Sequence, residues 1–464
     1  MRSTIHPCHC LPLLILAAAA SAQTPTYRVD FVGGAPATWS GPTAINAVND
    51  SGRVVGSTYV GTMRLAFVGW PGNGLSLLPL PAGATYAEAF DINTAGTVAG
   101  RVLLSGSSSR AVVWQLDPSG NYQALLLPAG PGNQLPFDAR GINDAGDVVG
   151  KYGILFASYV WRQGLGVTQL TGYPSYPEDI NERRQVIGDT YRMDVDTMVI
   201  EDLGNPVGTG FNYLFTKLAE INDAGQCGGY GNTASGQSAN KQAVRFTDGP
   251  VWRAFNSVPT ISANVMGIAA TGDTAFHLGA GTSGSYLHVD GFGTLGVAAL
   301  VDPAYAAWNV GSGQAPVISR GGRLATTGSN GTQAGIVVLS PLPFSDLGGG
   351  VRGALGTPIL TGYGDLRQGG TLRLRGASLE PGALAVLVVS LPSNPVQLLG
   401  ATVFPDLASA VVLPFVTDNL GRLEQTIALP FATTGMPLHA QAAALDAAAP
   451  FGVSVSNGLG GVAQ

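Results

Sequence analysis

Repeated acidic residues are the first candidates for chemistry in this chain. Asp50, Asp144 and Asp223 each follow an Asn and stand two positions before a Gly, within copies of one recurring motif. Carboxylates repeated in this way could bind calcium, but a calcium loop supplies several oxygen ligands at alternate positions. Each copy offers only the Asn-Asp pair, so the pattern favours a turn-forming role. The sequence predicts no metal site.

The densest acidic segment lies between positions 178 and 196. Its acidic members are Glu178, Asp179, Glu182, Asp194 and Asp196, and its basic members are Arg183, Arg184 and Arg192. Mixed charge of this kind is typical of a solvated rim, and we expect one here. A pair of carboxylates that binds substrate is the alternative.

The remaining candidates are histidines, aromatic residues and one cysteine. After the N-terminal segment discussed below, the histidines are His277, His288 and His439, and none has a second His or Cys at the spacing of a zinc site. We expect His288 to be an ordinary strand residue and Cys227 to be a buried, unreactive thiol. A sugar-stacking platform could be formed by Tyr173, Tyr176, Trp252 and Trp308, although packing is the commoner fate of such side chains. No nucleophile elbow or phosphate loop occurs, so we predict no catalytic and no cofactor-binding residue and leave the ligand-binding residues unassigned.

A repeat must position these residues. Seven copies of an apolar-Asn-Asp-x-Gly-x-Val-Val-Gly pattern, the last two of them weaker and without the Asn-Asp pair, are spaced between 38 and 50 positions apart. They begin at Val48, Ile92, Ile142, Ile180, Ile221, Ile268 and Ile318. The Asn predicts a capped type I turn, and the first Gly supplies the positive φ of a hairpin bulge. Arg184 replaces this Gly in the fourth copy. A left-handed Arg costs about 1–2 kcal/mol, so we expect that turn to be altered.

Each unit carries two further strand-like runs. One combines small and aromatic residues, as in Ala66–Trp70, and the other follows a Gly-rich turn, as in Leu75–Leu80. Four short strands in each unit predict an all-β, seven-bladed β-propeller. Tyr27–Val32 resembles a missing fourth strand of the last unit and could close the ring. Six or eight blades and an open solenoid remain alternatives.

These units resemble the HAF family of bacterial extracellular repeats. The resemblance rests on the Ile-Asn-Asp-x-Gly-x-Val-Val-Gly stretch beside an Ala-Phe-x-Trp stretch, and it covers roughly residues 24–345. It implies an exported repeat protein and brings no established reaction or ligand.

The chain beyond the repeats has a different character. Residues 346–354 are Gly-rich and predict a linker, and residues 355–464 predict a small β-sandwich-like module. Thr371–Arg375 alternates strictly, as a half-buried strand does. Gln441–Asp446 could be a strand or a short helix. The end of the chain resembles a C-terminal module of many secreted bacterial proteins, which implies an accessory role in sorting or surface retention.

The N-terminus and the composition bear on location and partners. Residues 1–22 read as a signal peptide: Arg2 precedes an apolar run, and Ala20-Ser21-Ala22 has the small residues of a cleavage site. Cys8 and Cys10 would be removed with it, leaving residues 23–345 as the propeller. Net charge is −6 without a basic run, so we expect no nucleic acid partner. No later stretch is apolar enough to span a membrane.

These features favour an exported, non-enzymatic binding or interaction protein of the cell surface or periplasm. Its ligand would be an extracellular or envelope polysaccharide or protein, and we expect no cofactor. A polysaccharide hydrolase or lyase with carboxylates at the propeller channel is the first alternative, and a structural envelope component is the second. Acidic residues from different blades that converge on the axis would favour the enzyme; small apolar channel residues would favour the binder.

Overall fold

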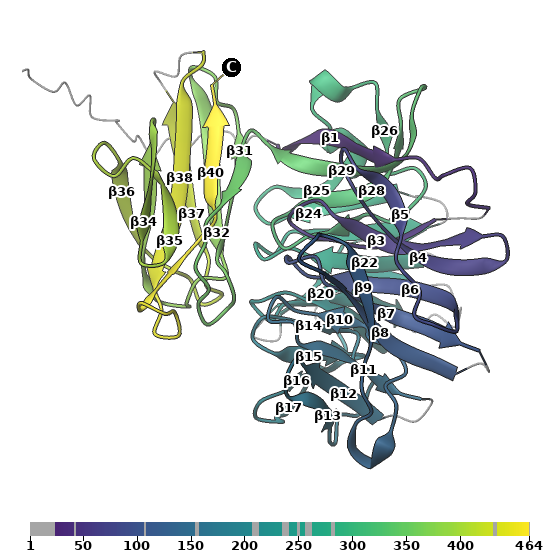
Figure 1. Ribbon diagram of the computed structural model, residues 1–464. Helices are drawn as coiled ribbons and strands as arrows, with labels where there is room; N and C mark the ends of the chain where they lie inside the picture. Colours follow the sequence, from purple (N-terminus) through teal and green to yellow (C-terminus); the bar gives the residue numbers. More distant parts are fainter. Residues whose placement is uncertain are drawn as a thin grey trace, which may run out of the picture. The chain divides into compact units, whose positions relative to one another are not determined.

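The computed structural model describes residues 24–40, 43–105, 108–153, 157–206, 213–233, 241–247, 251–255, 262–279, 284–429 and 434–463. They form two compact units, Thr26–Pro341 and a second that begins at Leu342. Both are built from antiparallel β-strands (Figure 1). The predicted signal peptide, residues 1–22, lies outside the described residues. Within those residues, no helix has the length and apolar character needed to cross a membrane.

The first unit is a seven-bladed β-propeller, as predicted. Four strands make each of the first three blades: β2 (Ala44–Val48), β3 (Val54–Val60), β4 (Met63–Trp70) and β5 (Gly74–Leu77); β6 (Ala84–Ile92), β7 (Val98–Leu104), β8 (Ser108–Leu116) and β9 (Tyr122–Leu126); β10 (Gly141–Ile142), β11 (Val148–Tyr152), β12 (Ala157–Arg162) and β13 (Gly166–Leu170).

Blades 4 to 6 repeat this order. They consist of β14 (Asp179–Ile180), β15 (Gln185–Gly188), β16 (Tyr191–Asp194) and β17 (Ile200–Asp202); β18 (Tyr213–Ile221), β19 (Cys227–Thr233), β20 (Lys241–Thr247) and β21 (Val251–Ala254); β22 (Ser262–Ile268), β23 (Thr274–Gly279), β24 (Gly284–Val289) and β25 (Gly293–Gly296).

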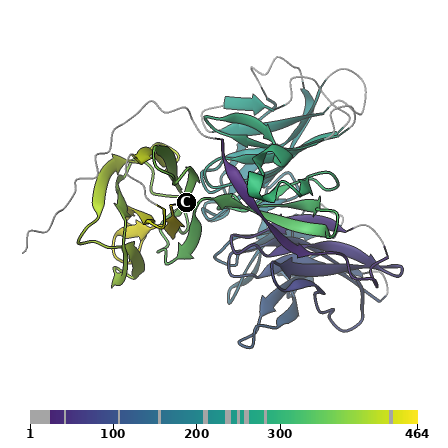
Figure 2. The same cartoon turned by 90° about the horizontal axis from the view of Figure 1, so that it is seen from above.

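The seventh blade joins the two ends of the propeller chain. β26 (Asn309–Val310) and β27 (Val317–Ile318) both pair with β28 (Leu324–Ser329), which pairs with β29 (Ala334–Leu342). The outermost strand is β1 (Thr26–Gly33), which lies beside β29 in both views (Figures 1 and 2). The N-terminal strand therefore closes the ring, as the sequence predicted, and it leaves no gap between the first and last blades of the array.

Each recurring motif forms the hairpin between the first and second strands of a blade. In blade 1 the Asn49 side-chain Oδ1 accepts a hydrogen bond from the Arg53 amide at 3.0 Å, and Gly52 has a φ of 80°. The expectation that the fourth turn would be altered was wrong. Arg184 adopts a φ of 59°, and its amide donates to Asn181 O at 3.1 Å, as the Gly52 amide donates to Asn49 O. Its guanidinium bonds Asp147 at 2.6 Å, which offsets the cost of the left-handed backbone.

The last Gly of the motif is required by a close approach between strands. A Cβ on Gly100 would lie 2.1 Å from Glu88 O and 2.7 Å from the Trp114 ring. The same position in blade 3, Gly150, would place a Cβ 1.9 Å from Asp138 O. The small residue thus leaves room for the neighbouring strand and for the aromatic side chain from the third strand.

The two ends of the propeller channel differ. The motif turns have four or five residues in every blade, and they define what we call the turn end. At the opposite, connection end, the chain passes from one blade to the next. Those connections vary in length, from residues 78–83 between β5 and β6 to residues 127–140 between β9 and β10. Variation in repeat length therefore falls at the connection end.

The second unit is a β-sandwich. One sheet has the order β30 (Ser345–Gly348), β40 (Gly458–Val462), β38 (Pro437–Leu445), β33 (Leu384–Ser390) and β36 (Val411–Val416), with β39 (Val453–Val455) beside β38. The other contains β31 (Ile359–Gly364), β32 (Gly370–Ala377) and β37 (Leu423–Leu429), and a hairpin is formed by β34 (Ser393–Leu398) and β35 (Ala401–Pro405). Leu372, Leu387 and Ile427 are buried in the core between the two sheets.

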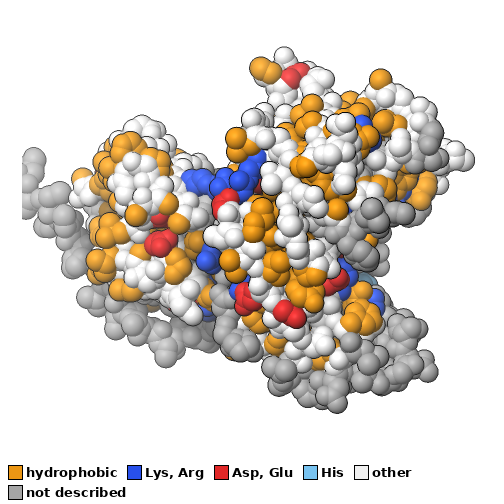
Figure 3. Space-filling model, turned by 90° about the horizontal axis from the view of Figure 1, so that it is seen from below, with side chains coloured by type: hydrophobic (Ala, Val, Ile, Leu, Met, Phe, Trp, Pro, Cys, Tyr) orange, Lys and Arg blue, Asp and Glu red, His pale blue; other side chains and the backbone are white. Residues whose placement is uncertain are grey.

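Two expectations for this unit can now be decided. Gln441–Asp446 lies largely in strand β38 rather than in a helix. The Gly-rich segment 346–354 is not a free linker, because Ser345–Gly348 pairs with β40 and Val351 pairs with Val455. Positive φ angles at Gly348 and Gly349 let the chain turn sharply after this edge strand. In the view of Figure 3, hydrophobic and uncharged side chains cover most of the surface, in line with a charged fraction of 11%.

Candidate binding site in the propeller channel

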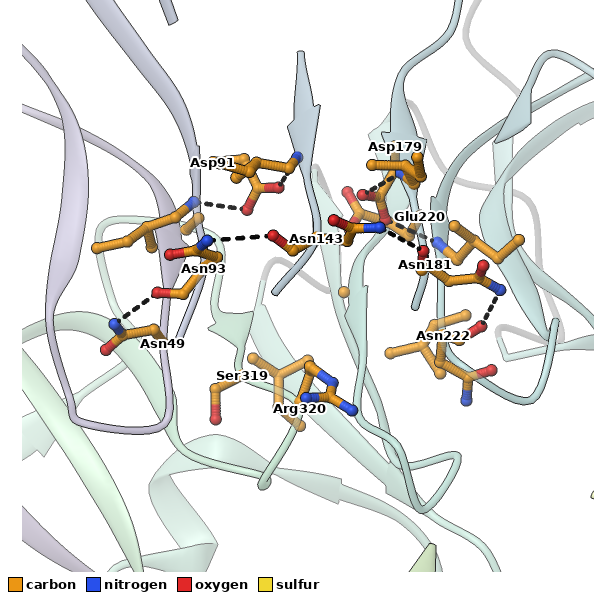
Figure 4. Close-up of a pocket in the computed structure, with 18 of the residues that line it drawn as sticks. Asn49, Asp91, Asn93, Asn143, Asp179, Asn181, Glu220, Asn222, Ser319 and Arg320 are labelled. Carbon is orange, nitrogen blue, oxygen red and sulfur yellow. Dashed lines mark hydrogen bonds between the residues drawn. The ribbon is translucent and has the colours of Figure 1, made fainter. Parts of the chain in front are cut away.

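The first strands of the blades surround a central cavity. Its volume is about 280 Å³, and residues from all seven blades line it (Figure 4). Three positions relative to the motif Asn provide most of the lining: the residue directly after it, and the second and third residues before it.

A row of asparagines on blades 1 to 5 joins consecutive blades, and Ala269 and Ser319 take the same position in blades 6 and 7. The side-chain Nδ2 of Asn93 donates to Asn143 O at 3.1 Å, and that of Asn181 donates to Asn222 O at 2.9 Å. The same bond runs from Asn49 to Asn93 and from Asn143 to Asn181. Each Asn also caps its own turn through Oδ1. A side-chain amide carries its donor and its acceptor on two separate atoms, so one Asn can bond the next blade and cap its own turn at the same time.

Acidic residues follow the asparagines and meet one arginine. Arg320 of blade 7 donates from Nη1 to Asp144 at 2.7 Å and from Nε to Asp223 at 3.0 Å, so it crosses the turn end of the channel. Burial alone would lower the pKa of Arg320, but Asp223 and Asp144, with help from Glu182 and Asp50, hold it above its usual value.

The calcium reading of these acidic residues finds no support in the geometry. The guanidinium of Arg320 already lies against Asp144 and Asp223. The described part of the chain contains no group of three or more His, Cys, Asp or Glu side chains placed to hold a metal ion.

A second set of carboxyl groups lies nearer the connection end. Asp91, Asp179 and Glu220 each stand two residues before the motif Asn, on blades 2, 4 and 5. A β-bulge in the first strand, seen between Ala89 and Asp91 and between Leu218 and Glu220, brings this position to face the cavity. We call these three residues the acid set.

Two members of the acid set join blades through backbone amides. Asp91 accepts from Ile92 N at 2.7 Å and from Ile142 N of the next blade at 2.8 Å. Asp179 accepts in the same way from Ile180 N and from Ile221 N of the next blade. Burial raises the pKa of Asp91 to about 6 despite these bonds, and burial together with Asp91 raises that of Asp179 well above its usual value.

Glu220 differs from the two aspartates. Its side chain is one methylene longer, and none of the described residues donates a hydrogen bond to it or forms an ion pair with it. Burial raises the pKa of Glu220 well above its usual value, and the charges of Asp179, Asp91 and Glu178 raise it further. Figure 4 shows Glu220 beside Asp179 at the cavity. Glu220 is thus a carboxyl group in the channel without a structural partner.

The structure divides the acidic segment 178–196 in two. Asp179 and Glu182 line the channel, and Glu182 is buried, so the expectation of a solvated rim was wrong for them. Two arginines of this segment form ion pairs instead: Arg184 of the motif turn with Asp147 and Asp196, and Arg192 of β16 with Glu201. Arg183 is exposed, and Asp194 caps a turn by accepting from Thr197 N.

The four proposed stacking aromatics do not come together. Tyr173 and Trp252 are buried in two neighbouring cores, and Trp308 packs against Phe31. Only Tyr176 remains, with the Lys151 ammonium 4.4 Å above its ring at the connection end. His288 is a buried residue of β24 and Cys227 is a buried thiol of β19, as expected.

The sequence analysis missed Asp91, Glu220 and Arg320 as channel residues. Alignment of the repeats on the motif Asn would have placed Asp91, Asp179 and Glu220 in one column. The same column holds Ala47, Gly141, Gly267 and Val317 in the other blades. Because the residue type varies so widely, the column cannot be recognised as a functional position unless it is known to face the channel.

Comparisons with known proteins add little. No protein-family model matches the chain, and no curated protein does either. Among solved structures, a streptogramin B lyase is similar over 68% of this chain and 98% of its own, with 12% sequence identity and a TM-score of 0.41. The assignment of the propeller rests on the strand topology described above.

Proposed function

We propose that this protein is exported and binds a glycan in the channel of its propeller, without chemical conversion of that glycan. The observation that carries the proposal is Glu220, a carboxyl group in a cavity of about 280 Å³ with no partner among the described residues. The signal-like N-terminus and the resemblance to HAF-type repeats support export.

The chemistry of the lining suits sugar hydroxyl groups. A carboxyl can accept hydrogen bonds and, when protonated, also donate one, as a hydroxyl requires of its partner, and a raised pKa favours the protonated form. Asn46 and the ring of Phe90 also line the cavity and add an amide and an apolar surface. Ligand sites combine apolar walls with a few well-placed polar groups in this way.

Binding of the mature chain, residues 23–464, to a panel of extracellular and envelope polysaccharides tests the proposal. We expect selective, saturable binding without product release. Glu220→Ala removes a hydrogen-bonding group worth about 1–1.5 kcal/mol, which corresponds to roughly a tenfold loss of affinity. Glu220→Gln keeps the size of the side chain and should lose less.

The matched control is Glu380→Gln in the sandwich unit, which should bind as the parent does. Failure of every glycan to bind, or equal affinity in Glu220→Ala, would contradict the proposal. Addition of calcium to each measurement checks whether a metal takes part.

A polysaccharide hydrolase or lyase is the second candidate. Three carboxyl groups from different blades converge on the channel, which is the arrangement we expected of an enzyme. It ranks second because Asp91 and Asp179 already bond backbone amides, whereas glycoside hydrolysis uses a pair of carboxyl groups. A carboxyl with a raised pKa, such as Glu220, can serve as a general acid. Release of shortened or unsaturated sugars by the parent chain, and its loss in Glu220→Gln, would establish this reading in place of the first.

The sandwich unit has its own core. We propose that it serves as an accessory module that retains the protein at the cell surface. Fractionation of cells that express the chain with and without residues 342–464 tests this: the truncated chain should appear in the medium.

A further inference from the structure

Aromatic rings and cationic side chains alternate at the connection end of blades 2 to 4. Arg101 lies between three rings, 5.6 Å from Tyr86, 5.9 Å from Phe90 and 5.7 Å from Phe137. Arg140 lies 4.4 Å from Phe90, and Lys151 lies 5.3 Å from Phe137 and 4.4 Å from Tyr176. Neighbouring cations therefore share a ring. We call these seven residues the cation–aromatic array.

Two of the cations form ion pairs with buried acidic residues. Arg101 pairs with Glu88 at 2.5 Å, and Arg140 pairs with Asp138 at 2.9 Å. The carboxylate side chains are 7% and 0% exposed, whereas those of Arg101 and Arg140 are 26% and 32% exposed. Arg140 also lies 3.9 Å from Glu178, whose side chain is 18% exposed, so the two arginines are more exposed to solvent than the acidic groups that pair with them. Lys151 forms no ion pair with any described residue.

The array is pre-organised for an anion attached to a ring. Cation–π contacts and buried carboxylates fix the cations in place, so little side-chain entropy remains to be lost on binding. An apolar ring surface lies next to each positive charge. In a uronic acid a carboxylate projects from a sugar ring whose C–H face is apolar. The carboxylate can pair with a cation of the array, and the C–H face can pack on an aromatic ring.

We infer that the cation–aromatic array binds uronate units of an acidic polysaccharide. This inference rests on the proposed function, because it assigns a class to the glycan proposed there. The array would be an outer binding site beside the channel. Phe90 and Arg140 belong to both, since they also line the cavity. The chain as a whole has a net charge of −6, so attraction of a polyanion must be local to such a surface.

Binding of the mature chain to polygalacturonate tests the inference, with its carboxyl-reduced form and single-stranded DNA as comparison ligands. Lys151→Gln is the variant of choice, because it leaves no buried carboxylate unpaired. We expect affinity for polygalacturonate to fall about five- to tenfold, as the loss of about 1 kcal/mol in one charged contact implies. Binding should also weaken as salt rises. The matched control is Arg183→Gln, an exposed cation at the turn end, which should change nothing.

The outcomes separate this inference from the proposed function. Equal binding of the carboxyl-reduced glycan, or unchanged affinity in Lys151→Gln, overturns the inference. DNA binding that matches polygalacturonate and depends on Lys151 also overturns it, because the array would then recognise any polyanion. If neutral glycans bind in a manner that depends on Glu220 while Lys151→Gln has no effect, the inference fails and the proposed function stands.

Discussion

At the scale of single residues, the carboxyl groups of the channel are of two kinds: those that bond the backbone and one that is available to a ligand. Asp91 and Asp179 each use one carboxylate oxygen to bind an amide of their own strand and the other to bind an amide of the next blade. Glu220 occupies the same position on blade 5 and makes no such bond among the described residues. An acidic residue that carries an electrostatic cost without a structural bond is the kind that function retains.

The pH dependence of stability should reveal that cost. The folded-state pKa of Glu220 is raised, so the folded protein binds the proton more tightly than the unfolded chain does. Stability then falls as pH rises from the unfolded pKa through the folded one. We expect Glu220→Gln to be more stable than the parent at pH 8, by about 0.5–2 kcal/mol.

Urea unfolding at pH 8 and at pH 4 measures this difference. The gap between Glu220→Gln and the parent should shrink at pH 4, because the carboxyl is then partly protonated in the unfolded chain as well as in the folded one. A gap that is the same at both pH values, or a less stable variant at pH 8, would show that Glu220 carries no such cost.

At the scale of the blade, the motif hairpin follows from local chemistry. Capping by Asn49 and the positive φ of Gly52 depend on residues within one turn, and both were predicted correctly. The altered turn at Arg184 was predicted wrongly, because Asp147, which stabilises it, comes from the preceding blade. Arg320 meets Asp144 from a position 176 residues away, and no local pattern could have paired them.

The last Gly of the motif provides a test at this scale. Gly100→Ala would place a methyl group 2.1 Å from Glu88 O, so the strands of blade 2 must separate. We expect a loss of about 3 kcal/mol or more in the free energy of unfolding, or failure to fold. Gly296→Ala is the matched control, because its φ is −66° and no atom lies within 4 Å of the added methyl.

Thermal unfolding of the two variants decides the matter. Gly296→Ala should melt within a few degrees of the parent. If Gly100→Ala did the same, the recurrence of this Gly would need a cause other than strand contact.

At the scale of the whole molecule, β1 is the element that turns seven sheets into a ring. Its side chains Tyr27 and Val29 are buried in the core of the last blades. Deletion of residues 24–33 would leave β29 as an open edge and uncover this core. We expect the truncated chain to be less stable and to self-associate.

Light scattering after size exclusion tests the role of β1. A peptide of residues 24–35, added in excess, should restore a monomer by pairing with β29. A truncated chain that is monomeric and as stable as the parent would show that the ring does not depend on its closing strand. The sequence predicted this strand because its pattern matched the fourth strand that the last unit lacks. Such a pattern can be recognised even though the two segments lie at opposite ends of the propeller chain.

This closure also gives folding an order in time. β1 emerges first during synthesis, yet its partner β29 ends at Leu342, so the first strand is among the last to find its place. Each of the other blades can form from consecutive strands as soon as its own segment is available. The ring cannot be sealed until more than three hundred residues are present on the same side of any membrane the chain crosses. A chain that has only partly crossed such a membrane therefore cannot complete the propeller.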